Sequence, residues 1–378
     1  METAVPIRYI DRHASPDAFA DAVVACADSG VVDHFASWDQ LTSWRPPLLW
    51  NTDVTPRAAQ MPDMDSWPDV LAMSAYALAR APGIGTAISI DALRRGPAEL
   101  MQTMLTMANL TRGRSIFMIG AGEQKQAKPF GWKRTQGLKR LEDSLQIFRR
   151  FWDTEGPISF QGHFWELQEA WLGGAKPYRP RTWALGGGPK LLDLATSYAD
   201  GFATMVPLVA ASPEQWAEQV TSMKQDLERK GRDPEAFYFG VFSAHLIHED
   251  PAVIDRALDN DLMRFDAAIM GRLNQADWAA EGVEPVFAAN WHYARDLLPV
   301  SMTRSEVDTV LAGVTRSMTE KMWINGTPAE VAAKIQPYVD AGATWVQVID
   351  SLPAVLPPED AANTIPRCIE VCRILKGK

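Results

Sequence analysis

The feature that most constrains the fold is an alternation of short apolar runs with helical segments along all 378 residues. Segment 138–152, for example, follows one such run and carries apolar residues at helical spacing on one face. Eight apolar runs, most of them followed by a helix, are the pattern of a (β/α)8 TIM barrel, an α/β fold. The predicted strands are residues 4–11, 30–35, 83–89, 115–120, 182–185, 201–206, 237–247 and 345–349.

Such a barrel needs about 250 residues, so we expect the remaining length to lie in insertions. Residues 37–64 are rich in Trp, Pro and Asp without a clean period, which predicts a long loop over the barrel mouth. Two alternating runs within 156–180 predict a surface β-hairpin. Residues 250–325 are mostly helical and too long for one crossover. We find no internal repeat or low-complexity linker and predict one domain, 1–378.

The composition is that of a globular protein, with 47% hydrophobic and 22% charged residues. A net charge of −10 argues against nucleic-acid binding. No apolar stretch approaches twenty residues, which argues against a membrane span, and the N-terminus lacks the features of a signal peptide. We therefore expect a cytoplasmic protein, a homodimer, that acts on a small molecule. Cys26, Cys368 and Cys372 suggest buried hydrophobic positions and no disulfide framework.

In a barrel, catalytic groups collect at the C-terminal ends of the strands, and three strings stand at predicted strand ends. The first is Asp33-His34-Phe35, followed by Trp38. An imidazole transfers protons near neutral pH, so His34 is a candidate acid or base. The alternative is a structural histidine bonded to backbone. Adjacent strand residues point to opposite faces, so Asp33 is not expected to orient His34.

The second string, Gly120-Ala121-Gly122-Glu123, places a carboxylate directly after a glycine turn, where it would face the barrel mouth. The alternative is a solvated loop residue. The third string, Gly186-Gly187-Gly188, lies between a strand and a helix. Glycines there let backbone N–H groups at the helix N-terminus approach a phosphate, and Lys190 could add charge. The alternative is a tight turn without a ligand. No set of residues has metal-ligand spacing, so we predict no metal.

Taken together, these strings resemble the luciferase-like superfamily of barrels, whose members bind flavin or its deazaflavin analogue, coenzyme F420. The string around His34 is similar to the F420 subgroup, which includes sugar-phosphate dehydrogenases, methylene-tetrahydromethanopterin reductases and ketoreductases of mycobacterial phthiodiolone lipids. The last group is most similar at Ile10-Asp11 and 91–97. The other segments that carry the resemblance are 110–114, 119–123, 128–131, 184–189 and 198–202.

The resemblance implies roles for individual residues. His34 would exchange a proton with the substrate's oxygen, Trp38 would pack near the reactive ring, and Glu123 would lie near the pyrimidine side of the deazaflavin. Asp11 and Trp44 would contact the substrate. An unusual cis peptide beneath the ring is implied near Ala87-Ile88. The implied cofactor-binding residues are Asp33, Ala87, Ile88, Gly120, Gly122, Gly186, Gly187, Gly188 and Lys190.

The chain departs from the sugar-phosphate dehydrogenases where these carry basic residues for the substrate phosphate. Leu208 and Met322 occupy those places, and the mouth loop carries Trp44, Trp50 and Met61. A bulky or lipophilic substrate fits this pattern, although the aromatic residues could also pack the loop or a dimer contact. The resemblance implies an F420-dependent oxidoreductase acting on a carbonyl, alkene or alcohol. The alternatives are an FMN-dependent monooxygenase and a non-catalytic cofactor-binding barrel.

Overall fold

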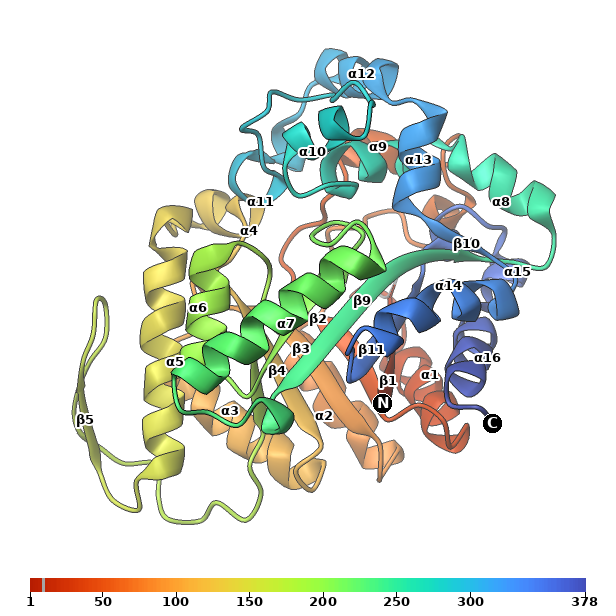
Figure 1. Ribbon diagram of the computed structural model, residues 1–378. Coiled ribbons are helices and arrows are strands. Elements are labelled where there is room, and N and C mark those ends of the chain that lie inside the picture. The colour runs from red at the N-terminus through yellow and green to blue at the C-terminus, as the bar shows by residue number, and fades with distance from the viewer. Residues whose placement is uncertain (9–10) are drawn as a thin grey trace.

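The computed structural model describes residues 1–8 and 11–378, in which parallel strands close into a barrel surrounded by helices (Figure 1). The order around the barrel is β1-β2-β3-β4-β7-β8-β9-β11, and β11 pairs with β1 to complete it. The predicted (β/α)8 fold is confirmed. The barrel strands are β1 (Glu2–Pro6), β2 (His34–Trp38), β3 (Gly85–Asp91), β4 (Ser115–Gly120), β7 (Arg181–Leu185), β8 (Gly201–Val206), β9 (Tyr238–Ile247) and β11 (Trp345–Asp350).

Most strands lie close to their predicted positions, but β1 and β2 do not. The sequence predicts the first strand over 4–11, whereas β1 begins at Glu2 and ends at Pro6. The sequence predicts a strand over 30–35, whereas β2 begins at His34 and ends at Trp38. Val31 and Val32 are buried in the segment before the strand and produced the misleading apolar run. Barrel strands are buried on both faces, so no alternation of polar and apolar residues marks their ends. The predicted first strand also includes residues 9 and 10, which lie outside the described residues.

Side chains fill the part of the barrel interior that lies on the N-terminal side of the strand ends. Small residues on several strands face the large rings of Trp183 and Trp345, whose centroids lie 5.6 Å apart in an edge-to-face arrangement. A Cβ on Gly240 would lie 2.9 Å from the Trp183 ring, so glycine is needed there. The small residues are Ala4, Ala36, Ala87 and Ala203. Space for a ligand is therefore found above this layer, toward the C-terminal ends of the strands.

Several of the surrounding helices begin at polar residues that cap them. Ser15 and Ser212 accept hydrogen bonds from the first turns of α1 and α7, and Thr327 forms a capping box with Glu330 at the start of α14. The surrounding helices are α1 (Pro16–Asp28), α2 (Val70–Arg80), α3 (Pro97–Leu110), α4 (Gln124–Ala127), α5 (Gly137–Asp153), α6 (Pro189–Tyr198), α7 (Pro213–Arg229), α14 (Pro328–Asp340), α15 (Pro358–Ala361) and α16 (Thr364–Leu375). No helix within residues 1–8 and 11–378 is long and apolar enough to cross a membrane.

Segment 156–180 contains the antiparallel hairpin of β5 (Ile158–Gln161) and β6 (Glu166–Ala170), which projects from the barrel beside α5 (Figure 1). The hairpin turn is tied to α5, because the buried Asp143 carboxylate accepts hydrogen bonds from the backbone N–H groups of His163 and Phe164 at 2.9 and 2.7 Å.

Two further segments cover the C-terminal ends of the barrel strands. The mouth loop, 37–64, contains η1 (Pro47–Leu49) and η2 (Pro56–Ala59). The helical insertion, 250–325, gathers at one end of the barrel (Figure 1). The two segments share an apolar core that includes Leu49, Trp50 and Phe265. The insertion comprises α8 (Pro251–Leu258), α9 (Asp261–Met270), α10 (Gln275–Ala280), α11 (Tyr293–Asp296), α12 (Arg304–Gly313), α13 (Arg316–Met322) and the start of β10 (Ile324–Gly326), a short strand that pairs with β9.

Candidate active site

A cavity of about 310 Å³ lies between the barrel mouth, the mouth loop and the helical insertion. Its floor is made by residues near the C-terminal ends of the strands, and its roof by the two covering segments. This is the end of a barrel where active sites form. Floor residues include Trp38, Ser89, Leu185, Met205, Phe242 and Ile349.

Glu123, just after β4, stands on the cavity wall with its carboxylate held by two neighbours. Trp44 Nε1 donates a hydrogen bond to Glu123 Oε1 at 3.1 Å. Lys125 Nζ lies 3.1 Å from Glu123 Oε2 and 4.4 Å from the centroid of the Trp44 ring. No aligned hydrogen bond from the described residues reaches Glu123 Oε2, which is buried. The structure thus brings together Glu123 and Trp44, two of the residues singled out from the sequence.

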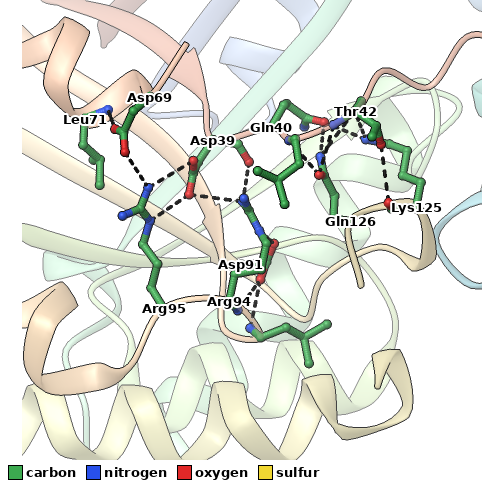
Figure 2. A network of polar contacts seen from close by, with 12 residues as sticks. Asp39, Gln40, Thr42, Asp69, Leu71, Asp91, Arg94, Arg95, Lys125 and Gln126 are labelled. Carbon is green, nitrogen blue, oxygen red and sulfur yellow. Dashed lines mark hydrogen bonds and ion pairs between the residues drawn. The ribbon is translucent and has the colours of Figure 1, made fainter. Parts of the chain in front are cut away.

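Lys125 is also bonded to the mouth loop (Figure 2). Its Nζ donates to Gln40 Oε1 at 2.6 Å and to the Thr42 carbonyl at 2.8 Å. Gln126 Nε2 donates to the same Gln40 oxygen, while its own Oε1 accepts from the Leu41 backbone N–H at 2.8 Å. Burial lowers the pKa of the Lys125 ammonium, and Glu123 opposes this effect.

A second polar cluster lies at the ends of β2 and β3 (Figure 2). Arg94 Nε donates to Asp91 Oδ2 at 2.5 Å, and Arg94 Nη2 lies 3.1 Å from Asp39 Oδ2. Arg95 Nε donates to the same Asp39 oxygen at 2.9 Å, and Arg95 Nη2 donates to Asp69 Oδ2 at 3.4 Å. Asp39 and Asp91 both line the cavity. Their carboxylates are paired with the two arginines.

The helical insertion contributes titratable groups through His292 and Tyr293 at α11. His292 Nδ1 accepts a hydrogen bond from the Ala294 backbone N–H at 3.0 Å, so the proton of the neutral ring is assigned to Nε2. Burial lowers the pKa of His292 to about 4, and Arg295 and Arg134 add to the effect. Burial also raises the pKa of Tyr293 above its usual range, and Glu123 adds to this. Both side chains are therefore neutral at pH 7.

The glycine segment after β7 meets the cavity only in part. Gly186 and Gly187 line it, and Gly186 has a φ of 138°, a conformation that favours glycine. A Cβ on Gly187 would lie 3.1 Å from Val209. Gly188 caps the N-terminus of α6 with a φ of 92°. Lys190 is exposed, and neither it nor Gly188 is among the described residues that line the cavity.

The remaining wall of the cavity is largely apolar. Leu208 and Met322, two apolar residues singled out from the sequence, both line it. The mouth loop adds Met61, and the insertion adds Met270 and Leu273. Among these walls lies a buried ion pair, in which Arg45 Nε is 3.1 Å from Asp266 Oδ1 and Arg45 Nη2 is 2.5 Å from Asp266 Oδ2. This pair joins the mouth loop to α9.

The expectation that His34 ends a strand at the mouth is wrong, because β2 begins there. His34 lies at the opposite end of the barrel, and the described lining of the cavity does not include it. Its ring nitrogens lie 3.4 Å from Trp345 Nε1 and 3.5 Å from Arg181 Nη2. Burial lowers the pKa of His34 to about 4. The neighbouring Asp33 carboxylate is bonded to Lys376 at 2.6 Å.

Three further candidates also lie away from the described cavity lining. Ala87 and Ile88 sit in the middle of β3, because this strand continues to Asp91, and the residues of β3 on the cavity wall are Ser89, Ile90 and Asp91. The cis peptide among the described residues is Val206–Pro207 and not Ala87–Ile88. The Asp11 carboxylate accepts hydrogen bonds from the backbone N–H groups of residues 13 and 14, which close a turn. Its sequence neighbour Ile10 lies outside the described residues.

Comparison with known families identifies the chain. A family model described as luciferase-like monooxygenase matches residues 54–344, which is more than half of the sequence. The chain belongs to the luciferase-like monooxygenase family. Within residues 1–8 and 11–378, no group of three or more His, Cys, Asp or Glu side chains is placed to hold a metal ion.

Two curated relatives cover most of this luciferase-like chain. A phthiodiolone/phenolphthiodiolone dimycocerosates ketoreductase of Mycobacterium tuberculosis is 26% identical over 367 residues, which are 95% of this chain and 93% of the relative. An F420-dependent glucose-6-phosphate dehydrogenase of Kineococcus radiotolerans is 24% identical over 341 residues, covering 87% and 86% of the two chains.

Solved structures share the luciferase-like fold over nearly the whole length. An F420-dependent secondary alcohol dehydrogenase in complex with an F420-acetone adduct superposes with a TM-score of 0.73 at 18% identity, covering 99% of both chains. A long-chain alkane monooxygenase superposes with a TM-score of 0.65 at 14% identity, covering 99% of this chain and 91% of its own.

Several cavity residues of this luciferase-like barrel were not found from the sequence. Lys125 follows Glu123 by two positions, which is the one local signal that could have drawn attention to it. Asp39 and Gln40 stand at the true end of β2 and were missed because that strand was placed too early. His292 and Tyr293 belong to an insertion whose path over the mouth has no sequence signature.

Proposed function

We propose that the chain is an F420-dependent oxidoreductase that transfers a hydride between the deazaflavin and a carbonyl, alkene or alcohol group of an organic substrate. The observation that carries the proposal is the convergence in one cavity of the Glu123 carboxylate, held beside Trp44, with the glycine segments that follow β4 and β7. The names of the two curated relatives and the F420-acetone adduct of the alcohol dehydrogenase support it.

The residues present fit such a cofactor. Glu123 Oε2 is buried at the cavity wall without an aligned hydrogen bond from the described residues, so it can accept one from a ring N–H. The glycines at 186 and 187 would let a phosphate approach the backbone N–H groups at the start of α6. Trp38, at the end of β2, would form part of the surface against which the ring packs.

When bound, the deazaflavin supplies the carbon that gives or takes the hydride, and the protein manages the proton. Tyr293 and His292 are neutral donors at the roof of the cavity, and either can bond to the substrate's oxygen. A phenol kept protonated by burial and by Glu123 can give its proton to an alkoxide, which is more basic. The mouth loop and the insertion cover this region, and the exclusion of water strengthens such interactions.

The apolar wall favours a bulky or lipophilic substrate. Leu208 and Met322 offer no charge to a phosphate, and Arg45, a guanidinium of the roof that lines the same cavity, is paired with Asp266. Apolar groups on a substrate would instead be desolvated against Met61, Met270 and their neighbours. We therefore propose that the substrate is an organic ketone, alkene or alcohol with an apolar body.

The test is a titration of the purified protein with F420 and with FMN, followed through quenching of tryptophan fluorescence. We expect tight binding of F420 and weak binding of FMN. Turnover is then measured with reduced F420 and apolar ketones, and with oxidised F420 and the matching alcohols. Glucose 6-phosphate serves as the polar control substrate. Failure to bind F420 would refute the proposal.

A luciferase-like monooxygenase using FMN is the second candidate, favoured by the description of the matching family model and by the alkane monooxygenase of the same fold. The same titration separates the two. Equal or tighter binding of FMN, together with oxygen uptake when reduced FMN is supplied, would support the monooxygenase.

A further inference from the structure

We propose that Lys125 is a positioning residue, which holds the Glu123 carboxylate fixed on the cavity wall as a hydrogen-bond acceptor for the bound ligand. The inference rests on the proposed function only for the identity of that ligand. The contacts that hold the glutamate lie within the chain itself.

The Lys125 ammonium is fully coordinated by the protein. An ammonium has three N–H donors; this one donates hydrogen bonds to Gln40 Oε1 at 2.6 Å and to the Thr42 carbonyl at 2.8 Å, and it lies in ion-pair contact with Glu123 Oε2 at 3.1 Å. The Trp44 ring lies 4.4 Å away and adds a cation–π contact. The side chain is 2% exposed. Because these contacts surround the ammonium, Lys125 is held in one position, and it in turn holds Gln40, Thr42 and Glu123 in place around it.

Burying a lysine is costly unless its charge is paired. The acceptors of Lys125 come from two different segments, since Gln40 and Thr42 belong to the mouth loop while Glu123 follows β4 (Figure 2 shows the contacts to the mouth loop). The lysine therefore fixes the distance between the mouth loop and the carboxylate. A neutral residue of similar size would fill the space without making an ion-pair contact to Glu123.

The carboxylate keeps acceptor capacity for a ligand. A carboxylate offers about four lone-pair sites, and the protein supplies Trp44 Nε1 to one oxygen and the Lys125 ammonium beside the other. Glu123 remains 20% exposed and lines the cavity. It can thus accept an N–H or O–H from a molecule in the cavity without first moving.

Other charged and titratable groups act on this pair from the surrounding elements. Arg94 near the end of β3 disfavours the Lys125 cation, and Asp65, which follows the mouth loop, favours it. Arg134, Tyr293 and His292 interact with Glu123 from the roof side. Lys125 is the cation in direct ion-pair contact with Glu123 among the described residues.

The experiment follows the Glu123 side-chain carboxyl by NMR at one fixed pH, in the protein without cofactor and labelled with 13C at the glutamate carboxyl. The Glu123 resonance is identified by its loss in Glu123→Gln. In Lys125→Gln, which keeps hydrogen-bonding groups but loses the charge, we expect this resonance to move and broaden, because the ion-pair contact that fixes the carboxylate is gone. Lys125→Arg, which keeps the charge, should remain close to wild type.

Lys376→Gln is the matched control, because it removes a lysine paired with a carboxylate at the opposite end of the barrel; its Glu123 resonance should not change. An unchanged Glu123 resonance in Lys125→Gln would overturn the inference. If that variant does not fold, Lys125→Met gives the same test, and aggregation of both with a normal Lys125→Arg would show that the charge serves folding alone, which also overturns it.

F420 binding gives the second measurement. Lys125→Gln should bind F420 about tenfold more weakly than wild type, as expected when a charge-assisted acceptor is lost, while Lys376→Gln should bind normally. Wild-type protein that binds no F420 would refute the proposed function, and the Glu123 resonance would still decide the role of Lys125. A changed Glu123 resonance with unchanged F420 affinity would show that Glu123 does not contact the ligand, against the inference.

Discussion

The two ends of the barrel carry similar residues in different surroundings. At the N-terminal end, His34 is packed against Trp345 and Arg181, and a Cβ on Gly85 would lie 2.4 Å from the His34 ring. At the C-terminal end, Glu123 and Lys125 are equally well bonded, but a cavity opens beside them. Both ends contain buried ionisable groups with shifted pKa values. Space for a ligand, and not residue type, distinguishes the end that can do chemistry.

The ion pairs of the two ends should differ most in their effect on stability. Arg45→Met leaves the Asp266 carboxylate buried without its partner, so the free energy of unfolding should fall by about 3–5 kcal/mol. The pair of Lys376 with Asp33 is partly exposed, and Lys376→Met should cost less than about 1 kcal/mol. Denaturant unfolding measures both. Recovery in Arg45→Met/Asp266→Leu would show that the unpaired charge causes the loss, whereas equal losses at the two ends would contradict the distinction.

Turnover should depend on the C-terminal end alone. Glu123→Gln removes the charged acceptor and should lower turnover with F420 and a ketone by about 10²–10³-fold, the usual cost of losing one preorganised electrostatic contact. His34→Gln, at the closed end, should change turnover only a few-fold. Thermal unfolding of both variants serves as the control for folding. A large loss in His34→Gln, with a normal melting temperature, would restore the role that the sequence resemblance assigned to this histidine.

At the closed N-terminal end, the buried His34 should make the free energy of unfolding depend on pH. Burial lowers the pKa of His34 from 6.5 to about 4 in the folded chain. Below pH 6.5 the unfolded chain takes up a proton that the folded chain does not, so the free energy of unfolding should fall between about pH 6.5 and 4. The loss should be roughly 3 kcal/mol. His34→Gln should show correspondingly less acid destabilisation in denaturant titrations, and His163→Gln, at an exposed site, should behave as wild type.

The sequence located the strands with sharp boundaries and failed where buried apolar residues continue beyond the end of a strand. β4 and β8 were predicted at their observed residues, because polar or glycine-rich segments flank them. β2 was placed four residues early at its start, since Val31 and Val32 continue the apolar character of the strand outside it. Because of that error, the sequence predicts His34 at the C-terminal end of the barrel, whereas it lies at the N-terminal end. The same error left Asp39 and Gln40, which follow the end of β2, without a predicted role.

The composition of the site was only partly predictable for a related reason. Glu123 and Trp44 were named because each belongs to a local string, but their contact joins positions 79 residues apart. The partners of Lys125 lie 83 and 85 residues away in the mouth loop. Hydrophobic period and turn signals describe neighbours along the chain, so they cannot show which loop residues meet across a barrel mouth.

The β5–β6 hairpin has a practical consequence. Its strands pair with each other and not with the barrel, and Asp143 fastens its turn to α5. The adjoining segment 171–178 is mostly exposed, with Trp171 45% accessible, and exposed loops of this kind tolerate inserted residues. An epitope, a dye or a surface linker placed there would leave the barrel sheet intact and the cavity open, so the enzyme could be immobilised and supplied repeatedly with fresh substrate.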